Sequence, residues 1–167
     1  MLSRKCLVVT CAATVTCLGL LAPSSSAEPP GFPDLSKFTE VDAAQFSRPF
    51  SYAERWANVY SFFRTLDGIN CTIGPGSWCS GNIPGLPQDR GSACKSVDQE
   101  ANDQQFTFTA HDSRCEPTKD KVLNPGQKLT DSLTGTKCVV GENRLTACVS
   151  TQGKHGFVLQ PSGSWAF

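Results

Sequence analysis

The two histidines are the residues of this sequence best suited to proton transfer near neutral pH. His155 stands between Gly153 and Gly156, where a ligand can approach the backbone closely. A catalytic histidine also needs an orienting carboxylate and a nucleophile or water within reach, and the sequence near His155 offers neither. His155 is therefore our candidate for ligand contact. A structural role, with its imidazole bonded to a backbone carbonyl in the turn of residues 153–157, is the stronger expectation.

Acidic side chains supply the other groups with catalytic potential. His111 and Asp112 are adjacent, and neighbours on a strand point to opposite faces, so we do not expect a dyad. Glu54 with Asp67 has the side chains of a glycosidase-like acid and base, and so does Asp112 with Glu116, but their separation is not written in the sequence. No G-x-S-x-G elbow, P-loop or HExxH motif occurs. The sequence therefore assigns no catalytic residue.

Six cysteines remain once a leader peptide of residues 1–27 is set aside. An even number in an exported chain favours disulfides, because the gaps of 8, 21 and 10 residues contain no CxxC pair and too few histidines accompany them for zinc. We expect no metal and no cofactor. Fifteen pairings are possible, and sequential pairing is favoured because each pair then closes one loop or joins adjacent strands. Each loop is worth roughly 2.6 to 3.4 kcal/mol by the chain-entropy model. The predicted bridges are Cys71–Cys79, Cys94–Cys115 and Cys138–Cys148.

The segment of residues 74–94 is rich in glycine and proline, so we expect a loop without regular structure, fixed by cysteine at both ends. Trp78, Ile83 and Leu86 would then form an exposed patch that binds a ligand or partner. An equally weighted alternative is that Trp78 packs over the neighbouring disulfide. Residues 83–85, Ile-Pro-Gly, would be the bait of a protease inhibitor.

The leader itself follows the pattern of a cleaved secretory signal. Arg4 and Lys5 precede an uncharged apolar run, and small residues end it at Ala27. Because the leader takes two basic residues, the remaining 140 carry 13 Lys or Arg against 15 Asp or Glu. This balance, without runs of like charge, gives no reason to expect nucleic acid as a partner or stable membrane insertion after cleavage.

Strand-like segments follow one another through the rest of the chain. We expect residues 28–50 to be an extended lead-in with one helical turn at 41–46, its phenylalanines packed on the domain. Asp67-Gly68 is the signal of a two-residue hairpin turn that faces Leu66 with Ile69. Placing Cys138 opposite Cys148 centres the next predicted hairpin on Asn143. Further strands are expected at residues 105–110, 157–159 and 165–167.

Several short motifs together resemble a family of small exported actinobacterial proteins, mycobacterial in type. They are Gly68-Ile69-Asn70-Cys71, Cys79-Ser80-Gly81, His155-Gly156-Phe157 and the ending Gly163-Ser164-Trp165-Ala166-Phe167. The resemblance covers nearly all of residues 31–167. It implies a secreted, β-rich fold with sequential disulfides, and it supplies no activity or catalytic residue.

Together these patterns predict a small all-β domain of antiparallel hairpins, barrel-like or sandwich-like, stapled by disulfides and with little helix. The predicted organisation is a signal peptide (1–27), the lead-in (28–50) and one disulfide-rich β domain (51–167). We expect a secreted or cell-wall-associated, noncatalytic protein that binds a protein or glycan of the envelope. The alternatives are a small secreted hydrolase acting on envelope material and a protease inhibitor.

Overall fold

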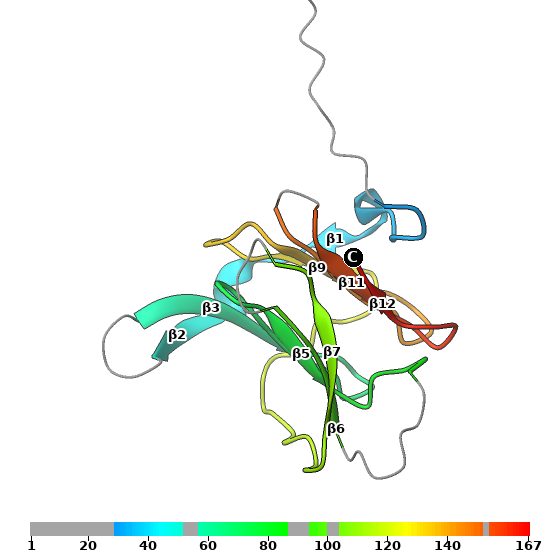
Figure 1. Ribbon diagram of the computed structural model, residues 1–167. Coiled ribbons are helices and arrows are strands. Elements are labelled where there is room, and N and C mark those ends of the chain that lie inside the picture. Colours follow the sequence, from blue (N-terminus) through cyan, green and yellow to red (C-terminus); the bar gives the residue numbers. More distant parts are fainter. Residues whose placement is uncertain (1–28, 52–56, 87–93, 100–103, 152–153) are drawn as a thin grey trace, which may run out of the picture.

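The computed structural model of the protein describes residues 29–51, 57–86, 94–99, 104–151 and 154–167. Within these ranges the chain forms two six-stranded sheets, which confirms an all-β fold with little helix. We call the sheet that contains the C-terminal strands sheet A and the other sheet B. In Figure 1 the orange-to-red strands of sheet A lie above the green strands of sheet B. The elements are η1 (Leu35–Lys37), β1 (Thr39–Glu40), η2 (Ala43–Gln45), β2 (Ser47–Ser51), β3 (Ala57–Arg64), β4 (Asn70–Ile73), β5 (Trp78–Gly81), β6 (Cys94–Asp98), β7 (Thr107–His111), β8 (Gln127–Thr130), β9 (Lys137–Val140), β10 (Thr146–Val149), β11 (Gly156–Leu159) and β12 (Trp165–Ala166).

Both sheets are built mainly from strands that follow one another in the chain. Sheet B runs β2-β3-β4-β5-β6-β7, with every neighbouring pair antiparallel. Sheet A runs β1-β8-β9-β10-β11-β12, where only β1 and β8 are parallel. No helix in the described part of the chain is long and apolar enough to span a membrane.

One hydrophobic core joins the two sheets into a sandwich. Phe63 and Val97 of sheet B belong to the same buried cluster as Leu129 and Phe157 of sheet A. Strand side chains alternate between two faces, so each sheet contributes every second residue to this core. A smaller cluster of Val139, Ala147 and Val158 lies apart from it.

The lead-in packs against the sandwich and contributes strands to it. Phe32 and Phe38 pack against the smaller cluster, and Phe46 is buried in the main core. The predicted helical turn is present as η2, whose first turn is capped by the Asp42 side chain accepting from Ala44 N at 3.0 Å. β1 then joins sheet A and β2 joins sheet B, so this segment links both layers. The side chain of Phe50 lies outside the described residues.

The β3–β4 hairpin differs by one residue from the predicted register. The predicted two-residue turn faced Leu66 with Ile69. In the structure Thr65 N donates to Ile69 O at 2.8 Å, so residues 66–68 form a three-residue loop with Gly68 at φ +87°. A one-residue shift exchanges the faces of a strand. Phe63 therefore enters the core and is fully buried. Arg64 is on the opposite face, so its charge is not buried in the apolar core, which would be unfavourable.

The two C-terminal hairpins follow the predicted pattern. Cys138 lies opposite Cys148, and the turn uses left-handed backbone at Asn143 (φ 56°) and Arg144 (φ 62°). The end of the chain forms β12, with Trp165 opposite Val158 at the edge of sheet A. Figure 1 shows this red strand next to β11.

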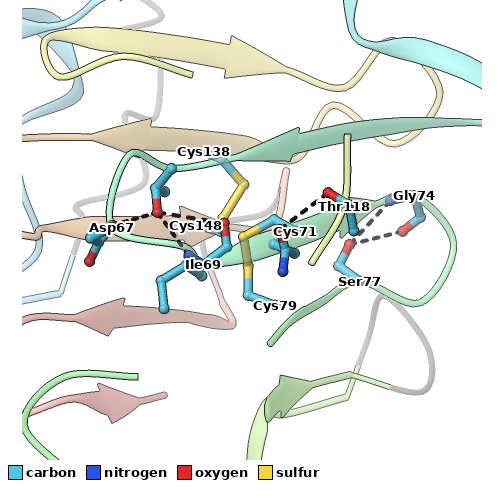
Figure 2. Close-up of a disulfide and its surroundings, with 11 residues drawn as sticks. Asp67, Ile69, Cys71, Gly74, Ser77, Cys79, Thr118, Cys138 and Cys148 are labelled. Atoms are coloured by element: carbon cyan, nitrogen blue, oxygen red, sulfur yellow. Dashed lines mark hydrogen bonds between the residues drawn. A yellow bond between two sulfur atoms is a disulfide. The ribbon is translucent and has the colours of Figure 1, made fainter. Parts of the chain in front are cut away.

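All three predicted disulfides are present. Cys71–Cys79 and Cys138–Cys148 each join directly paired residues of neighbouring strands, with Cα atoms 4.1 Å apart. All four of these cysteines are in the main core, and Figure 2 shows the two bridges together. Cys94–Cys115 instead ties the start of β6 to the segment that follows β7. The bridges thus fasten the centre of each sheet and one end of sheet B.

The prediction for residues 74–94 was wrong, because β5 lies within this segment. β5 pairs with β4 on one side and with β6 on the other, which places it in the middle of sheet B. The turn before it is closed by Ser77, whose hydroxyl donates to Gly74 O at 3.1 Å and accepts from Gly74 N at 3.2 Å (Figure 2). Glycine and proline here mark tight turns on both sides of a four-residue strand.

Candidate functional site

The three apolar side chains predicted to form an exposed patch do not form one. Ile83 is only 2% exposed and belongs to the main core, and Leu86 packs partly buried against that core. Trp78 is half-buried on β5. The predicted patch is therefore wrong, because the paired strand β5 holds the segment against the sandwich and lets Ile83 enter the core. Of the three, only Trp78 keeps a place on the outer face of a sheet.

The segment predicted as protease bait is docked on the β11–β12 turn. Ser164 Oγ donates to Pro84 O at 2.5 Å. Gly85 has φ +68°, and a Cβ at this position would lie 2.3 Å from Gln160 O. A bait loop has to project from its scaffold to enter a protease cleft. Residues 83–85 are packed against their own protein instead, so this geometry does not support the inhibitor hypothesis.

His155 is anchored through its backbone. Its N–H lies 3.4 Å from Ser150 Oγ, and its carbonyl accepts from Ser150 N at 2.9 Å. The buried Nδ1 has no hydrogen-bond partner among the described residues, so the predicted imidazole–carbonyl bond is not found there. Residue 153, part of the predicted turn, lies outside the described residues. No carboxylate or nucleophile contacts the imidazole within the described ranges.

The outer face of sheet B carries a continuous set of polar and aromatic side chains. Phe63, Cys71 and Cys79 occupy one cross-strand row of the core face, so the adjacent rows point away from the core. We call this surface the Trp78 face. Its first row is Phe62, Thr72, Trp78, Asp98 and Thr107, its second row is Arg64, Asn70, Ser80, Ser96 and Thr109, and His111 lies beyond the second row.

A hydrogen-bonded group of three side chains lies on β6 and β7 of this face. Ser96 Oγ donates to Asp98 Oδ2 at 3.0 Å and lies 2.9 Å from His111 Nε2. Ser96 is 7% exposed, Asp98 is half-buried and His111 is exposed. The group thus extends from the sheet surface into solvent. His111 meets a carboxylate through Ser96 and not through its sequence neighbour Asp112, which supports the expectation that residues 111 and 112 form no dyad.

The protons in this group run from the imidazole toward the carboxylate. An ionised carboxylate only accepts, so the single Ser96 hydroxyl proton is directed to Asp98. In the tautomer that carries its proton on Nε2, His111 then donates to Ser96 Oγ. In serine hydrolases the order is reversed: the carboxylate holds Nδ1 of the histidine, and Nε2 accepts the serine proton. In this tautomer the arrangement orients polar groups for hydrogen bonding, and its proton order is opposite to that of a serine hydrolase.

Aromatic rings of β3 and β5 lie beside one another on the outer side of sheet B. The Tyr60 and Trp78 ring centroids are 6.5 Å apart, and Tyr60 lies 6.4 Å from Phe62. The Tyr60 hydroxyl donates to Pro75 O at 2.8 Å, which fixes its ring over the β4–β5 turn. The Arg48 guanidinium stacks 3.9 Å above the Phe62 ring. The rings are thus held in place by their own contacts before any ligand arrives.

The segment after β7 crosses one end of the face. Cys115 ties it to β6, and Thr118 Oγ1 donates to Asn70 Oδ1 at 3.2 Å on β4. Asp120, whose side chain is 7% exposed, then forms a 2.7 Å ion pair with Arg48 on β2. A hollow of about 190 Å³ opens at this point, lined in part by Phe62. This segment forms a rim beside the Trp78 face.

The carboxylates considered as acid–base pairs have different surroundings in the structure. Asp67 accepts from Thr65 Oγ1 and pairs with Arg144 at 3.0 Å, so it fastens two hairpin tips together. Asp112 and Glu116 are both exposed, and Glu54 lies outside the described residues. The described residues contain no group of three side chains suited to hold a metal ion.

Period-two spacing of polar residues on β6 was the signal that sequence reasoning missed, whereas the alternation that became β7 was recognised. Ser96 and Asp98 are two residues apart on one strand, and Thr107, Thr109 and His111 repeat the same spacing on the next. Each set identifies polar side chains on one face. Bringing the two sets together required the register of β6 and β7, which pairs Ser96 with Thr109. The residue pattern of either strand alone does not predict that register.

No family model, curated protein or solved structure matches this chain.

Proposed function

We propose that the protein is an exported, noncatalytic binding protein of the extracellular space or cell envelope, and that it recognises a glycan through the Trp78 face. One observation carries this proposal: a single sheet face places the fixed rings of Trp78 and Tyr60 beside the hydrogen-bonded group of Ser96, Asp98 and His111. The resemblance to small exported actinobacterial proteins agrees with this role.

A sugar ring has apolar C–H faces and hydroxyl groups around its edge. Aromatic side chains pack against the C–H faces, and neighbouring donors and acceptors form hydrogen bonds with the hydroxyl groups. Adjacent strands are about 4.8 Å apart, so Trp78 on β5 and the Ser96 group on β6 and β7 are spaced to contact one sugar ring and its substituents. With its Nε2 proton directed to Ser96, the neutral His111 ring offers Nδ1 as an acceptor, and the Asp98 carboxylate is an acceptor as well. Two acceptors suit a neutral ligand that is rich in hydroxyl donors.

Export is supported by two independent features of the chain. The N-terminal segment has the charge and apolar pattern of a signal peptide, and six cysteines form three disulfides in the folded domain. Disulfides of this kind form and persist in oxidising compartments. An envelope or extracellular glycan is a ligand available there.

Binding is tested with the oxidised protein on an array of neutral and acidic oligosaccharides, followed by titration of the strongest ligand. We expect Trp78→Ala and Asp98→Asn each to weaken binding about tenfold or more, corresponding to about 1.4 kcal/mol. Leu133→Ala is the matched control, because Leu133 is 53% exposed on a turn of the other sheet. Absence of binding to any oligosaccharide, or equal binding by all four proteins, would contradict the proposal.

The Ser96–His111 contact of 2.9 Å makes a small hydrolase the second candidate. Hydrolysis would require His111 Nε2 to accept the Ser96 proton, against the direction set by Asp98. The two functions separate in an assay with chromogenic esters and glycosides. Turnover that is lost in Ser96→Ala would support the hydrolase, whereas the binding proposal expects no turnover by the unaltered protein.

A further inference from the structure

In the described part of the chain, three of the four sheet edges carry features that discourage pairing with another strand. β1 and β12 are only two residues long. β2 contains Pro49, which has no N–H to donate, and Arg48, which is engaged with Asp120. Short strands, proline and charge are the usual means by which proteins block their sheet edges. The fourth edge, β7, has none of them.

β7 is a regular five-residue strand, Thr107–His111. All five residues pair with β6 in a continuous register, without a bulge. The strand holds no proline, lysine, arginine or carboxylate, and four of its residues are exposed. Thr109 is at its centre. An unprotected edge of this length and composition is a template for an added strand.

The hydrogen-bond pattern shows which backbone groups face outward. Gln99 N donates to Ser77 O at 2.9 Å, one position beyond the β5–β6 pair of Trp78 and Asp98, so this position of the ladder is a hydrogen-bonded one. Hydrogen-bonded and non-hydrogen-bonded pairs alternate along an antiparallel ladder and from one ladder to the next. Val97, two positions before Gln99, therefore also directs its N–H and C=O toward β5. Because Val97 makes no backbone bond to its β7 partner Phe108, the N–H and C=O of Phe108 point away from β6.

Ala110 lies two residues beyond Phe108 and has the same orientation. The backbone groups of Phe108 and Ala110 have no backbone hydrogen-bond partner in the described parts of the chain. β7 thus offers two donors and two acceptors in line along its outer side. They are spaced for an antiparallel strand of the same kind.

We propose that β7 pairs with β7 of a second copy of this chain, antiparallel about a two-fold axis at Thr109. Phe108 then exchanges both backbone hydrogen bonds with Ala110 of the partner subunit, and Ala110 does the same with Phe108 of the partner subunit. Thr109 faces Thr109 of the partner subunit, a favourable cross-strand pair. The two copies of sheet B become one continuous twelve-stranded sheet.

The chemistry of β7 fits a second copy because the pairing is self-complementary. Thr107 faces His111 of the partner subunit, so no like charges are opposed at any position of the strand, even when the histidines are protonated. Without the predicted leader the chain carries 13 basic and 15 acidic residues, a small net charge, so long-range repulsion between copies is weak. A symmetric pair of this type is closed and does not extend into a fibre.

The test uses complementary charges at the two-fold axis. Thr109→Lys and Thr109→Glu each place like charges directly opposite one another, which disfavours the pair. We expect sedimentation and light scattering to show that the oxidised unaltered protein doubles its mass between micromolar and millimolar concentration. Each single variant should stay monomeric, and an equimolar mixture of the two should recover the doubled mass. Leu133→Lys is the control for an added charge and should behave as the unaltered protein does.

A backbone variant distinguishes strand pairing from a side-chain effect. Ala110→Pro removes an outward N–H without removing a β6–β7 hydrogen bond, so it should abolish the dimer while near-UV circular dichroism shows an intact fold. The proposal is overturned if the unaltered protein is monomeric at millimolar concentration, if its dimer persists in Thr109→Lys, or if the Lys and Glu variants fail to associate when mixed. Binding of an extended peptide by a protein that stays monomeric would overturn it in favour of a different occupant.

Discussion

At the scale of single residues, Ile83 and Trp78 show how differently two apolar side chains of one segment are used. Ile83 contacts the main core and is 2% exposed, whereas Trp78 stays on the outer face of sheet B. They are only five positions apart in the sequence. The first stabilises the sandwich, and the second is a part of the candidate binding surface.

Replacing Ile83 with alanine should therefore destabilise the protein. Loss of a buried isoleucine side chain leaves a cavity and costs about 2 to 5 kcal/mol of unfolding free energy. Urea denaturation of the oxidised protein measures this change. The control Leu133→Ala removes a 53% exposed side chain and should change the stability by about 0.5 kcal/mol or less. Equal stability of Ile83→Ala and the unaltered protein would show that Ile83 is not in the core.

Ser61 provides a bond between the two sheets. Its hydroxyl, on β3, donates to Asp131 Oδ2 at 2.8 Å, and Asp131 follows the last residue of β8. Asp131 is 1% exposed, and its Oδ1 accepts from Leu133 N and from the backbone and side chain of Thr134. The carboxylate thus depends on protein donors, since water hardly reaches it.

Ser61→Ala should cost about 1 to 3 kcal/mol of unfolding free energy, because it leaves a buried carboxylate oxygen without its donor. Ser132→Ala removes an exposed hydroxyl from the adjacent turn and serves as the control. Denaturant midpoints of the two variants should differ clearly. If they coincide, the bond between the sheets contributes nothing to stability.

At the scale of elements, turn geometry determines how the hairpins are placed. The β3–β4 and β9–β10 tips are joined by Arg144, which pairs with Asp67 at 3.0 Å and donates from Nη2 to Asn82 O at 3.1 Å. Arg144 and its neighbour Asn143 both have positive φ. The left-handed turn therefore directs the guanidinium of sheet A toward a turn of sheet B.

Asn143→Val should weaken this hairpin, because a β-branched residue pays roughly 1 to 2 kcal/mol in left-handed backbone. Asn143→Gly removes the same side chain but adopts positive φ freely, so it should be close to neutral. Thermal unfolding of the pair isolates the backbone effect from any effect of the asparagine side chain. Equal loss of stability in both variants would contradict a backbone cause.

Sequence patterns identified several of these elements. They gave a wrong prediction where the same residues were compatible with two local structures. Asp67-Gly68 marked a turn correctly, but a two-residue loop and a three-residue loop both satisfy that signal. The choice depended on Arg64 and Phe63, of which only the phenylalanine can be buried without a partner. In the same way, glycine and proline around β5 marked turns, while its pairing with β4 and β6 was a tertiary event.

At the scale of the whole molecule, two of the three disulfides lie inside the core that joins the sheets. Their loss removes both a chain constraint and part of the core packing. The three loops together are worth on the order of 9 kcal/mol in the chain-entropy model, comparable with the total stability of a typical domain.

Full reduction should therefore unfold the protein or leave it without fixed tertiary packing. Near-UV circular dichroism before and after reduction, with the thiols blocked, measures the loss. Oxidised protein carried through the same buffer changes is the control. Cooperative unfolding of the reduced form, at a midpoint near that of the oxidised form, would show that the core alone suffices.

The sequence by itself determined the all-β class, the sequential disulfides, the Cys138–Cys148 hairpin and the terminal strand. These depend on local signals: cysteine spacing, turn residues and alternation over a few positions. Only the tertiary structure decided that Ile83 is buried, that Ser96 meets His111, and that β7 lies at an edge of sheet B. The physical reason is that each of these depends on which strands become neighbours, and that is set by the burial and hydrogen bonding of the whole sandwich at once.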